Sequence, residues 1–370
     1  MKKIFFVLLV GLMFFSVLSF SEGTVKIGVA LPMTGGIASF GQMVYQGIEI
    51  ANQMFPTVLG MKVELILADN RSDKTEAANV ISRLINLNGV VGILGEVASS
   101  NTLAGGAVAE KAGIPLLSPA STNPLVTQGK NFVSRVCFID PFQGHVAAIF
   151  ALNNLKAKTA AVFTDVAQDY SVGLSNFFVK DFTAGGGTVY KEYYQSGDQD
   201  FSAQLTDALS HNPDVIYVSG YYPEIALMAK QARQLGYTGP FLAGDGAEAP
   251  ELIKIGGSAV NGLYYTSHFN ADHPATKMGQ EFVAKYEALY HTSPSALAAL
   301  GFDTYLVMLN AIERAGSTDP AKINAAIRST KNFEGATGYI TIGDDGNAVK
   351  SAVINEVVNG QFTYVTTINP

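Results

Sequence analysis

Two pairs of hydroxyl side chains follow two short apolar runs, and together they could bind a charged small molecule. Ser99 and Ser100 come just after the run VVGIL, and Ser121 and Thr122 come just after IPLL. The carboxyl ends of parallel strands lie at one sheet edge, where helix N-termini present unpaired N–H groups to an anion. Each pair alone is more typical of helix caps and turns than of a binding site. Two pairs at successive strand ends favour a binding site.

A carboxylate and two tyrosines are expected at other strand ends. Asp245 lies in GPFLAGDG, held between two glycines and free to meet a cation. Tyr221 precedes a Pro223 that suits the first turn of a helix, so its ring should stand in a cleft or pack in the core. Tyr170, in TDVAQDYSVG, is a candidate cleft wall, with Asp165 beyond the same strand.

Other kinds of chemistry have little support. The stretch GDGAEA fits one form of the dinucleotide fingerprint, but an acid between its glycines would repel a pyrophosphate, so we expect no cofactor. The closest histidines, His268 and His273, are five residues apart and suit no common metal motif. We therefore expect surface or loop histidines, no metal site and no catalytic residue, since no nucleophile elbow, Walker loop or H-E-x-x-H motif occurs either.

Apolar runs of strand length alternate with segments of helical periodicity, which predicts an α/β protein with parallel sheets and right-handed crossovers. Asp73 and Glu76 have capping-box spacing, and Asn88-Gly89 should end that helix. Two hairpin strands, GATGYITIG and AVINEVV, are expected around Asp345-Gly346. The expected strands are 25–33, 62–70, 90–94, 114–120, 159–165, 188–195, 214–220 and 239–246; the expected helices are 44–55, 73–88, 101–112, 142–154, 171–182, 201–209 and 223–235, with 273–330 mostly helical.

Length and composition indicate an exported protein of two lobes. The chain has 370 residues, 48% of them hydrophobic, enough for a large core. Residues 1–21 read as a secretory signal peptide, with an uncleaved anchor as the alternative. Its removal takes two lysines and no acid, moving the formal charge from −7 to −9, which argues against nucleic acid as a partner. The single cysteine, Cys137, lies in the apolar run FVSRVCF and should be a buried small hydrophobe.

These motifs carry a resemblance that covers nearly the whole mature chain. VKIGVALPMTGGIASFGQ, DNRSD, GEVASSNT, PLLSPASTNP, FTDVAQDYSVG, SGYYPEIALMAKQARQLG and GDG occur in this order. The chain resembles the periplasmic leucine/isoleucine/valine-binding proteins of ABC transporters. The resemblance implies the periplasmic binding protein type I fold, two Rossmann-like α/β lobes joined by a three-segment hinge. We expect residues 24–141 with 270–348 to form lobe 1, and 142–269 with 349–370 to form lobe 2.

The resemblance also implies a set of ligand contacts. Ser99, the N–H of Thr122 and the Tyr221 hydroxyl would hold the ligand carboxylate. The Ala120 carbonyl, the Thr122 hydroxyl and Asp245 would take the ammonium group. The side-chain wall would comprise Phe40, Val97, Ala98 and Tyr170. Several members have glutamate in place of Asp245 and tyrosine in place of Phe40.

The physical chemistry of the motifs agrees with an amino-acid ligand, because burying a zwitterion needs donors for one end and an acid for the other. We therefore expect a periplasmic, monomeric solute-binding protein that closes its lobes on leucine, isoleucine or valine, docks on membrane permease subunits, and needs no cofactor. The alternatives are a sensor of the same fold that binds an amide, urea or another amino acid, and a secreted amide hydrolase. The hydrolase would need an activated nucleophile, and no histidine stands beside Ser99 or Thr122 in the sequence.

Overall fold

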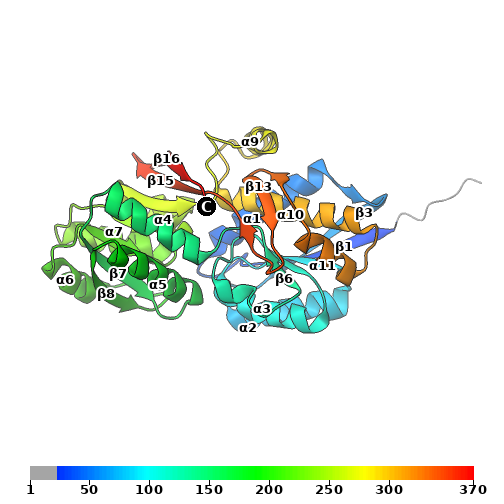
Figure 1. The fold of residues 1–370 in the computed structure, drawn as a ribbon, viewed down its shortest axis with the longest axis horizontal. Helices are drawn as coiled ribbons and strands as arrows, with labels where there is room; N and C mark the ends of the chain where they lie inside the picture. The colour runs from blue at the N-terminus through cyan, green and yellow to red at the C-terminus, as the bar shows by residue number, and fades with distance from the viewer. Residues whose placement is uncertain (1–22) are drawn as a thin grey trace, which may run out of the picture.

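The computed structural model describes residues 23–370, and these residues form two α/β lobes (Figure 1). The predicted signal peptide lies outside the described residues. The first lobe contains a six-stranded sheet in the order β2-β3-β1-β4-β5-β6, parallel except for the β2–β3 pair. Its strands are β1 (Thr24–Leu31), β2 (Thr57–Val58), β3 (Met61–Asp69), β4 (Gly92–Gly95), β5 (Leu116–Ser118) and β6 (Val133–Arg135).

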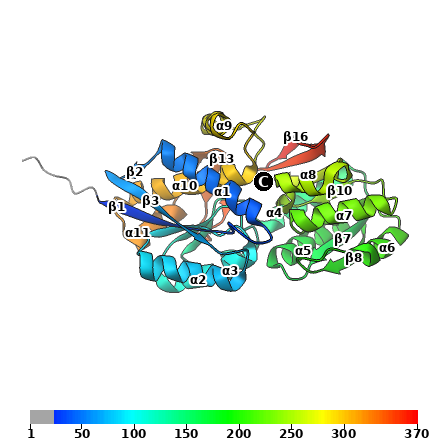
Figure 2. The ribbon, with the colours of Figure 1, turned by 180° about the vertical axis from the view of Figure 1, so that it is seen from behind.

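Helices cover both faces of the first sheet. In Figure 2, α2 and α3 lie on one side of the sheet, and α1 and α10 lie on the other. A Cβ on Gly47 of α1 would lie 1.8 Å from the carbonyl oxygen of Ala298, and one on Gly301 of α10 would lie 2.1 Å from that of Val44. Only glycine permits these two helix backbones to approach so closely. The helices of this lobe are α1 (Ala38–Met54), α2 (Lys74–Arg83), α3 (Ser99–Ala112), α9 (Lys277–Tyr290), α10 (Ala296–Ala315) and α11 (Pro320–Arg328).

The second lobe is built on a seven-stranded sheet in the order β16-β15-β11-β10-β9-β7-β8. Its helices α4 and α5 face the viewer in Figure 1, and α7 and α8 face the viewer in Figure 2, so the sheet is covered on both sides. The strands are β7 (Thr159–Asp165), β8 (Thr188–Tyr194), β9 (Val215–Val218), β10 (Phe241–Ala243), β11 (Leu263–Ser267), β15 (Ala352–Val358) and β16 (Gln361–Ile368); the helices are α4 (Asp140–Asn153), α5 (Asp169–Ala184), α6 (Ser202–Ser210), α7 (Tyr222–Gln234) and α8 (Pro250–Gly256).

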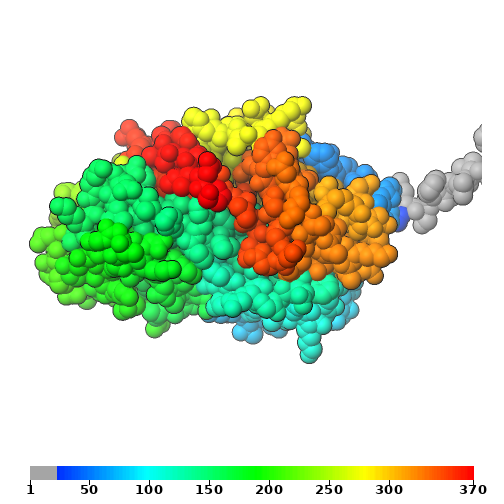
Figure 3. All heavy atoms as spheres, in the orientation of Figure 1, coloured from blue at the N-terminus to red at the C-terminus, as the bar shows by residue number. Residues whose placement is uncertain are grey.

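The chain passes between the lobes three times, which confirms the predicted fold class. It crosses between β6 and α4, between β11 and α9, and between β14 (Ala348–Val349) and β15. A small antiparallel sheet of β12 (Phe333–Gly335), β13 (Gly338–Ile342) and β14 precedes the third crossing. Figure 3 shows the two lobes touching along the face that it presents.

Local signals located several element ends correctly. The Asp73 side chain accepts a hydrogen bond from the Glu76 N–H, as the capping spacing predicted, and Gly89 ends the following π-helical turn η1 (Leu84–Asn88) with a left-handed φ of 66°. The start of α1 was predicted six residues too late. Gly41 lies within this helix, and a Cβ there would lie 2.3 Å from the carbonyl oxygen of Pro32, so only glycine fits at this position.

The predicted hairpin around Asp345-Gly346 is only partly correct. That turn joins β13 to β14, whereas AVINEVV forms β15 in the other lobe, antiparallel to both β11 and β16. The first four residues of β15 are all buried, as is typical of an interior strand and not of one arm of an isolated hairpin. The chain therefore changes lobes between the two runs.

Helix α10 and Cys137 are both buried in the core of the protein. Among the described helices, only α10 is long and apolar enough to cross a bilayer, and 89% of that apolar window is buried inside the fold. Cys137 is fully buried, and burial raises the pKa of its thiol to about 12. The thiol therefore behaves as the small hydrophobe that the sequence predicted.

Candidate functional site

A small enclosed cavity of about 20 Å³ lies between the two lobes. A cavity of this size holds about one water molecule, so a larger ligand requires the cleft to widen. Of the nine residues predicted as ligand contacts, seven line it, and Ala98 and Thr122 are buried beside them. The lining residues are Phe40, Val97, Ser99, Ala120, Tyr170, Tyr221, Asp245, Gly246 and Leu297.

The first lobe presents hydroxyl groups to the cleft from the start of α3 and the loop after β5. Ser99 is the first residue of α3, and its Oγ accepts a hydrogen bond from the Asn123 N–H at 3.2 Å. The Thr122 hydroxyl is buried beside the buried Asp140 carboxyl group, and its hydrogen bond to that group lowers the Asp140 pKa, against the larger opposite effect of burial. As the donor in that contact, Thr122 Oγ1 keeps acceptor capacity at the place where a ligand would arrive.

The other two members of the hydroxyl pairs have structural roles. Ser121 Oγ donates to backbone carbonyls of the Glu96–Val97 segment and shares a hydrogen bond with Thr102. Ser100 contacts the second lobe, as described below. These two hydroxyl groups are therefore engaged with protein groups, Ser121 within the first lobe and Ser100 across the lobes.

A buried arginine fixes the loop that carries Thr122. Arg135 is fully buried and donates to the carbonyl oxygens of Ser121 and Asn123 and to the hydroxyl of Thr127. Burial lowers the pKa of its guanidinium group. Sequence reasoning passed over Arg135, although a charged residue within the apolar run FVSRVCF was the available signal.

The second lobe presents one carboxylate, Asp245, whose oxygens already accept three hydrogen bonds. Oδ1 accepts from Tyr170 Oη at 2.7 Å and from Gln143 Nε2 at 2.8 Å. Oδ2 accepts from His268 Nε2 at 2.9 Å. Burial raises the pKa of Tyr170 well above its usual value, so this hydroxyl keeps its proton and donates it. A carboxylate has about four lone-pair sites, so one acceptor site remains.

Glycines allow this close packing around the carboxylate. A Cβ on Gly244 would lie 2.3 Å from the Tyr170 hydroxyl, and one on Gly246 would lie 2.4 Å from the carbonyl oxygen of Gly220. The Gly246 N–H also donates to Tyr170 Oη at 3.2 Å. The G-D-G sequence therefore accommodates Tyr170 and presents Asp245 at the turn η3 (Asp245–Ala247).

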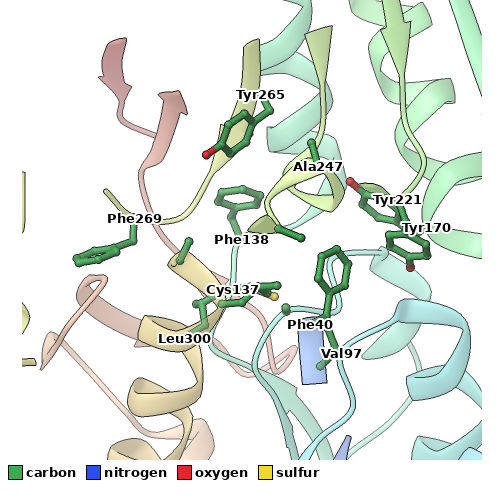
Figure 4. Close-up of a cluster of buried hydrophobic side chains, with 14 of the residues drawn as sticks. Phe40, Val97, Cys137, Phe138, Tyr170, Tyr221, Ala247, Tyr265, Phe269 and Leu300 are labelled. Carbon is green, nitrogen blue, oxygen red and sulfur yellow. The ribbon is translucent and has the colours of Figure 1, made fainter. Parts of the chain in front are cut away.

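Aromatic rings from both lobes meet at the cavity. The Tyr170 and Tyr221 rings stack with centroids 5.4 Å apart, and Phe40 meets Tyr221 edge-on at 5.7 Å. Figure 4 shows Phe40 pointing from the first lobe toward these two tyrosines. The three rings form an apolar wall on which an aliphatic side chain could pack.

His268 lies in a loop, as one of the predicted alternatives has it, but it is 3% exposed and contacts Asp245, which the sequence did not indicate. Its ring stacks on Phe138 with centroids 3.7 Å apart and an interplanar angle of 24°. Among the described residues no group of three His, Cys, Asp or Glu side chains is arranged to hold a metal ion. His268 and Gln143 are thus polar neighbours of the site that sequence reasoning missed.

Direct contacts hold the two lobes against each other beside the cavity. Ser100 Oγ donates to Asp169 Oδ2 at 2.9 Å and accepts from the Asp169 N–H at 2.9 Å. Asn123 Nδ2 donates to the Asp169 carbonyl at 2.7 Å. On the other flank, Tyr222 Oη donates to the Gly36 carbonyl at 3.3 Å. We call the Ser100, Asn123 and Asp169 contacts the interlobe latch.

The arrangement as a whole suits binding of a small dipolar molecule. Hydroxyl and N–H groups at the start of α3 and after β5 suit an anionic end. The Asp245 carboxylate faces them across the cavity and suits a cationic end. None of the hydrogen bonds among the described residues joins a histidine to Ser99 or Thr122, so the geometry does not assemble an activated nucleophile there.

Comparison with known proteins places the chain in a family. Residues 24–361 match the family model described as periplasmic binding protein. The leucine-, isoleucine-, valine-, threonine- and alanine-binding protein of Pseudomonas aeruginosa is 30% identical over 341 residues, which cover 90% of this chain and 89% of that protein.

Two solved structures share the fold over nearly their whole length. The crystal structure of a leucine binding protein, LivK, from Thermotoga maritima is 58% identical, with a TM-score of 0.93 over 94% of this chain and 99% of that one. The substrate binding protein LivJ from Streptococcus pneumoniae, in complex with isoleucine, is 30% identical, with a TM-score of 0.89 over 94% of this chain and 100% of that one. The chain therefore belongs to the periplasmic binding protein family and has its type I fold.

Proposed function

We propose that this protein is the extracytoplasmic solute-binding component of an ABC importer and that it binds leucine, isoleucine or valine between its lobes. The observation that carries the proposal is the pairing across one cavity of Ser99 on the first lobe with Asp245 on the second. The relatives include leucine-, isoleucine- and valine-binding proteins, which supports the ligand class.

The proposed ligand pose satisfies both charged ends of an amino acid. The carboxylate accepts from Ser99 Oγ, the Thr122 N–H and the Tyr221 hydroxyl. The three ammonium hydrogens go to the Ala120 carbonyl, to Thr122 Oγ1 and to the remaining acceptor site of Asp245. Thr122 Oγ1 and Asp245 each have an acceptor site available, which supports this assignment of the ammonium hydrogens.

The proposed side-chain pocket discriminates weakly among aliphatic amino acids. Phe40, Val97, Ala98 and Tyr170 form its wall, and Leu297 adds an apolar residue that the sequence did not indicate. One methylene in an apolar pocket is worth about 0.8 kcal/mol, roughly a fourfold preference. Hydrogen bonds to charged groups contribute about 1.5–3 kcal/mol each, so the head-group contacts dominate affinity.

The proposed mechanism is binding without turnover. The first lobe, residues 24–141 with 270–348, takes the amino acid, and the second lobe, residues 142–269 with 349–370, swings onto it. The closed, monomeric form then docks on membrane permease subunits in the periplasm, after removal of the signal peptide. The net charge of −9 that remains after this removal, from −7 for the full chain less two lysines, supports a partner other than nucleic acid.

The ligand class is tested by identifying what the protein carries. Protein purified without added amino acids is denatured mildly, and the released small molecules are identified by mass spectrometry. The proposal expects leucine, isoleucine or valine, and titration calorimetry with each should give affinities within about tenfold of one another. Release of an amide, urea or an aromatic acid, with no heat on adding leucine, would reject it.

A further inference from the structure

We infer that His268 is a positioning residue, which orients the Asp245 carboxylate toward the ligand ammonium while leaving its negative charge intact. This inference rests on the proposed function, in which Asp245 accepts one ammonium N–H. His268 lies outside the cavity lining and reaches the ligand only through Asp245.

Stacking on Phe138 holds the His268 ring in place, and the ring in turn holds the Asp245 carboxylate through a hydrogen bond. His268 lies on the second crossing between the lobes, directly after β11, and its ring stacks on Phe138 of the first crossing at 3.7 Å. The stacked ring cannot turn without losing this contact. Its Nε2 lies 2.9 Å from Asp245 Oδ2, so the plane of the carboxylate is tied to the two crossings.

The hydrogen-bond partners determine which ring nitrogen carries the proton. The partner of Nε2 is a carboxylate oxygen, which can only accept, so Nε2 carries hydrogen. Nδ1 is buried and has no partner in the described structure. A proton there would be a buried donor without an acceptor, which is unfavourable. The expected species is the neutral imidazole with its proton on Nε2.

A neutral donor is what an ammonium site requires. A histidinium ion would neutralise Asp245 and leave no net negative charge for the ligand. Burial lowers the pKa of His268, Asp245 opposes that shift, and the buried Lys350 adds to it. Lys350 is itself paired with Asp303 at 3.9 Å. The surroundings therefore favour an uncharged ring beside a charged carboxylate.

The number of acceptor sites already used on Asp245 shows which of its oxygens is left for the ligand. Gln143, Tyr170 and His268 occupy three of about four lone-pair sites on Asp245. Only His268 bonds to Oδ2 among the described residues, so the remaining site is on that oxygen. Without the His268 contact the carboxylate could rotate and Oδ2 would lose its fixed direction toward the ligand.

The test compares two ligands that differ only at the ammonium end, leucine and 4-methylpentanoate, by titration calorimetry. His268→Phe keeps a ring for stacking on Phe138 and removes the donor. It should weaken leucine binding by about tenfold or more, as expected for a lost charge-assisted contact, and change 4-methylpentanoate binding by less than threefold. His268→Gln restores an N–H donor and should stay within about fivefold of the parent for leucine. Equal losses for both ligands in His268→Phe, or none, would overturn the inference.

A control variant and an NMR measurement distinguish a specific effect at His268 from a general effect of replacing a histidine. His145, which is exposed, makes a 2.8 Å contact with Asp181 and is not among the residues that line the cavity, so His145→Phe should leave both affinities unchanged. In the parent, ¹⁵N NMR of His268 at pH 7 should show the Nε2–H tautomer. A proton on Nδ1 would contradict the inference even if no variant folds. If the parent fails to bind leucine, the proposed function is rejected, and the tautomer alone then decides the His268–Asp245 arrangement.

Discussion

Replacing Asp245 by asparagine removes the negative charge of the second lobe's binding group while keeping its size. The side-chain oxygen that remains can still accept from Tyr170 and Gln143. The new amide NH₂ then faces His268 Nε2, which is a donor in the parent. Whichever way the asparagine turns, one buried donor loses its acceptor.

The expected effect on binding follows from the single acceptor site that Asp245 offers to the ligand. A hydrogen bond to a charged group is worth about 1.5–3 kcal/mol, so leucine affinity should fall by about 10- to 150-fold. The donor left without an acceptor should also lower the free energy of unfolding by about 1–3 kcal/mol. Binding of 4-methylpentanoate should not weaken, because this ligand has no ammonium group.

Calorimetry and urea unfolding measure these two effects separately. Glu248→Gln is the matched control, because Glu248 is another buried carboxyl group of the same segment, bonded to Ser267 and the Ala296 N–H and outside the cleft cavity. Its leucine affinity should stay within threefold of the parent. If Asp245→Asn also stays within threefold, the assignment of the ammonium group to Asp245 is wrong.

Three further changes separate binding, closure and stability. Thr122→Val removes a buried hydroxyl that offers an acceptor to the ligand ammonium group, so calorimetry should show about a tenfold loss of leucine affinity; unchanged affinity would exclude this hydroxyl as a ligand contact. Ser100→Ala removes two hydrogen bonds to Asp169, about 1–3 kcal/mol together, so small-angle scattering should show a larger open fraction, and an identical profile would refute the latch. Burial raises the pKa of Glu96 from 4.5 to about 8, so the folded state holds a proton that the unfolded chain has lost between these values. Stability should therefore fall as pH rises through that window, by up to about 1.4 kcal/mol per unit, and urea unfolding of Glu96→Gln should show a shallower fall; an unchanged slope would contradict the raised pKa.

The sequence was informative where a property depends on neighbours in the chain. The Asp73 cap and the helix end at Gly89 follow from local patterns, and the structure bears them out, whereas strands such as the predicted 239–246 are shorter in the structure, at Phe241–Ala243. The alternation of strands and helices was enough to predict parallel sheets and two lobes. Because parallel strands end at common edges, residues such as Ser99 could be expected at the cleft before any coordinates were considered.

The rest depends on partners that are distant in sequence. Gln143 reaches Asp245 across 102 positions and His268 across 23, and no local pattern indicates either contact. The local pattern gave no sign of the crossing that sends β15 into the second lobe, since Asp345-Gly346 gives only a turn signal; only the family resemblance assigned residues 349–370 to that lobe. Arg135 was visible in the sequence as a lone charge within an apolar run. Its role could not be predicted, because it depends on the folded loop whose carbonyl groups it binds.

The central claim is that the two lobes share one small zwitterion, the first taking its carboxylate and the second its ammonium group. A crystal structure of the protein with leucine tests this most directly. The account predicts the leucine carboxylate within hydrogen-bond distance of Ser99 Oγ and the Thr122 N–H, with the ammonium nitrogen beside Thr122 Oγ1 and Asp245 Oδ2. Leucine bound with both ends on one lobe, or in a different cavity, would contradict it.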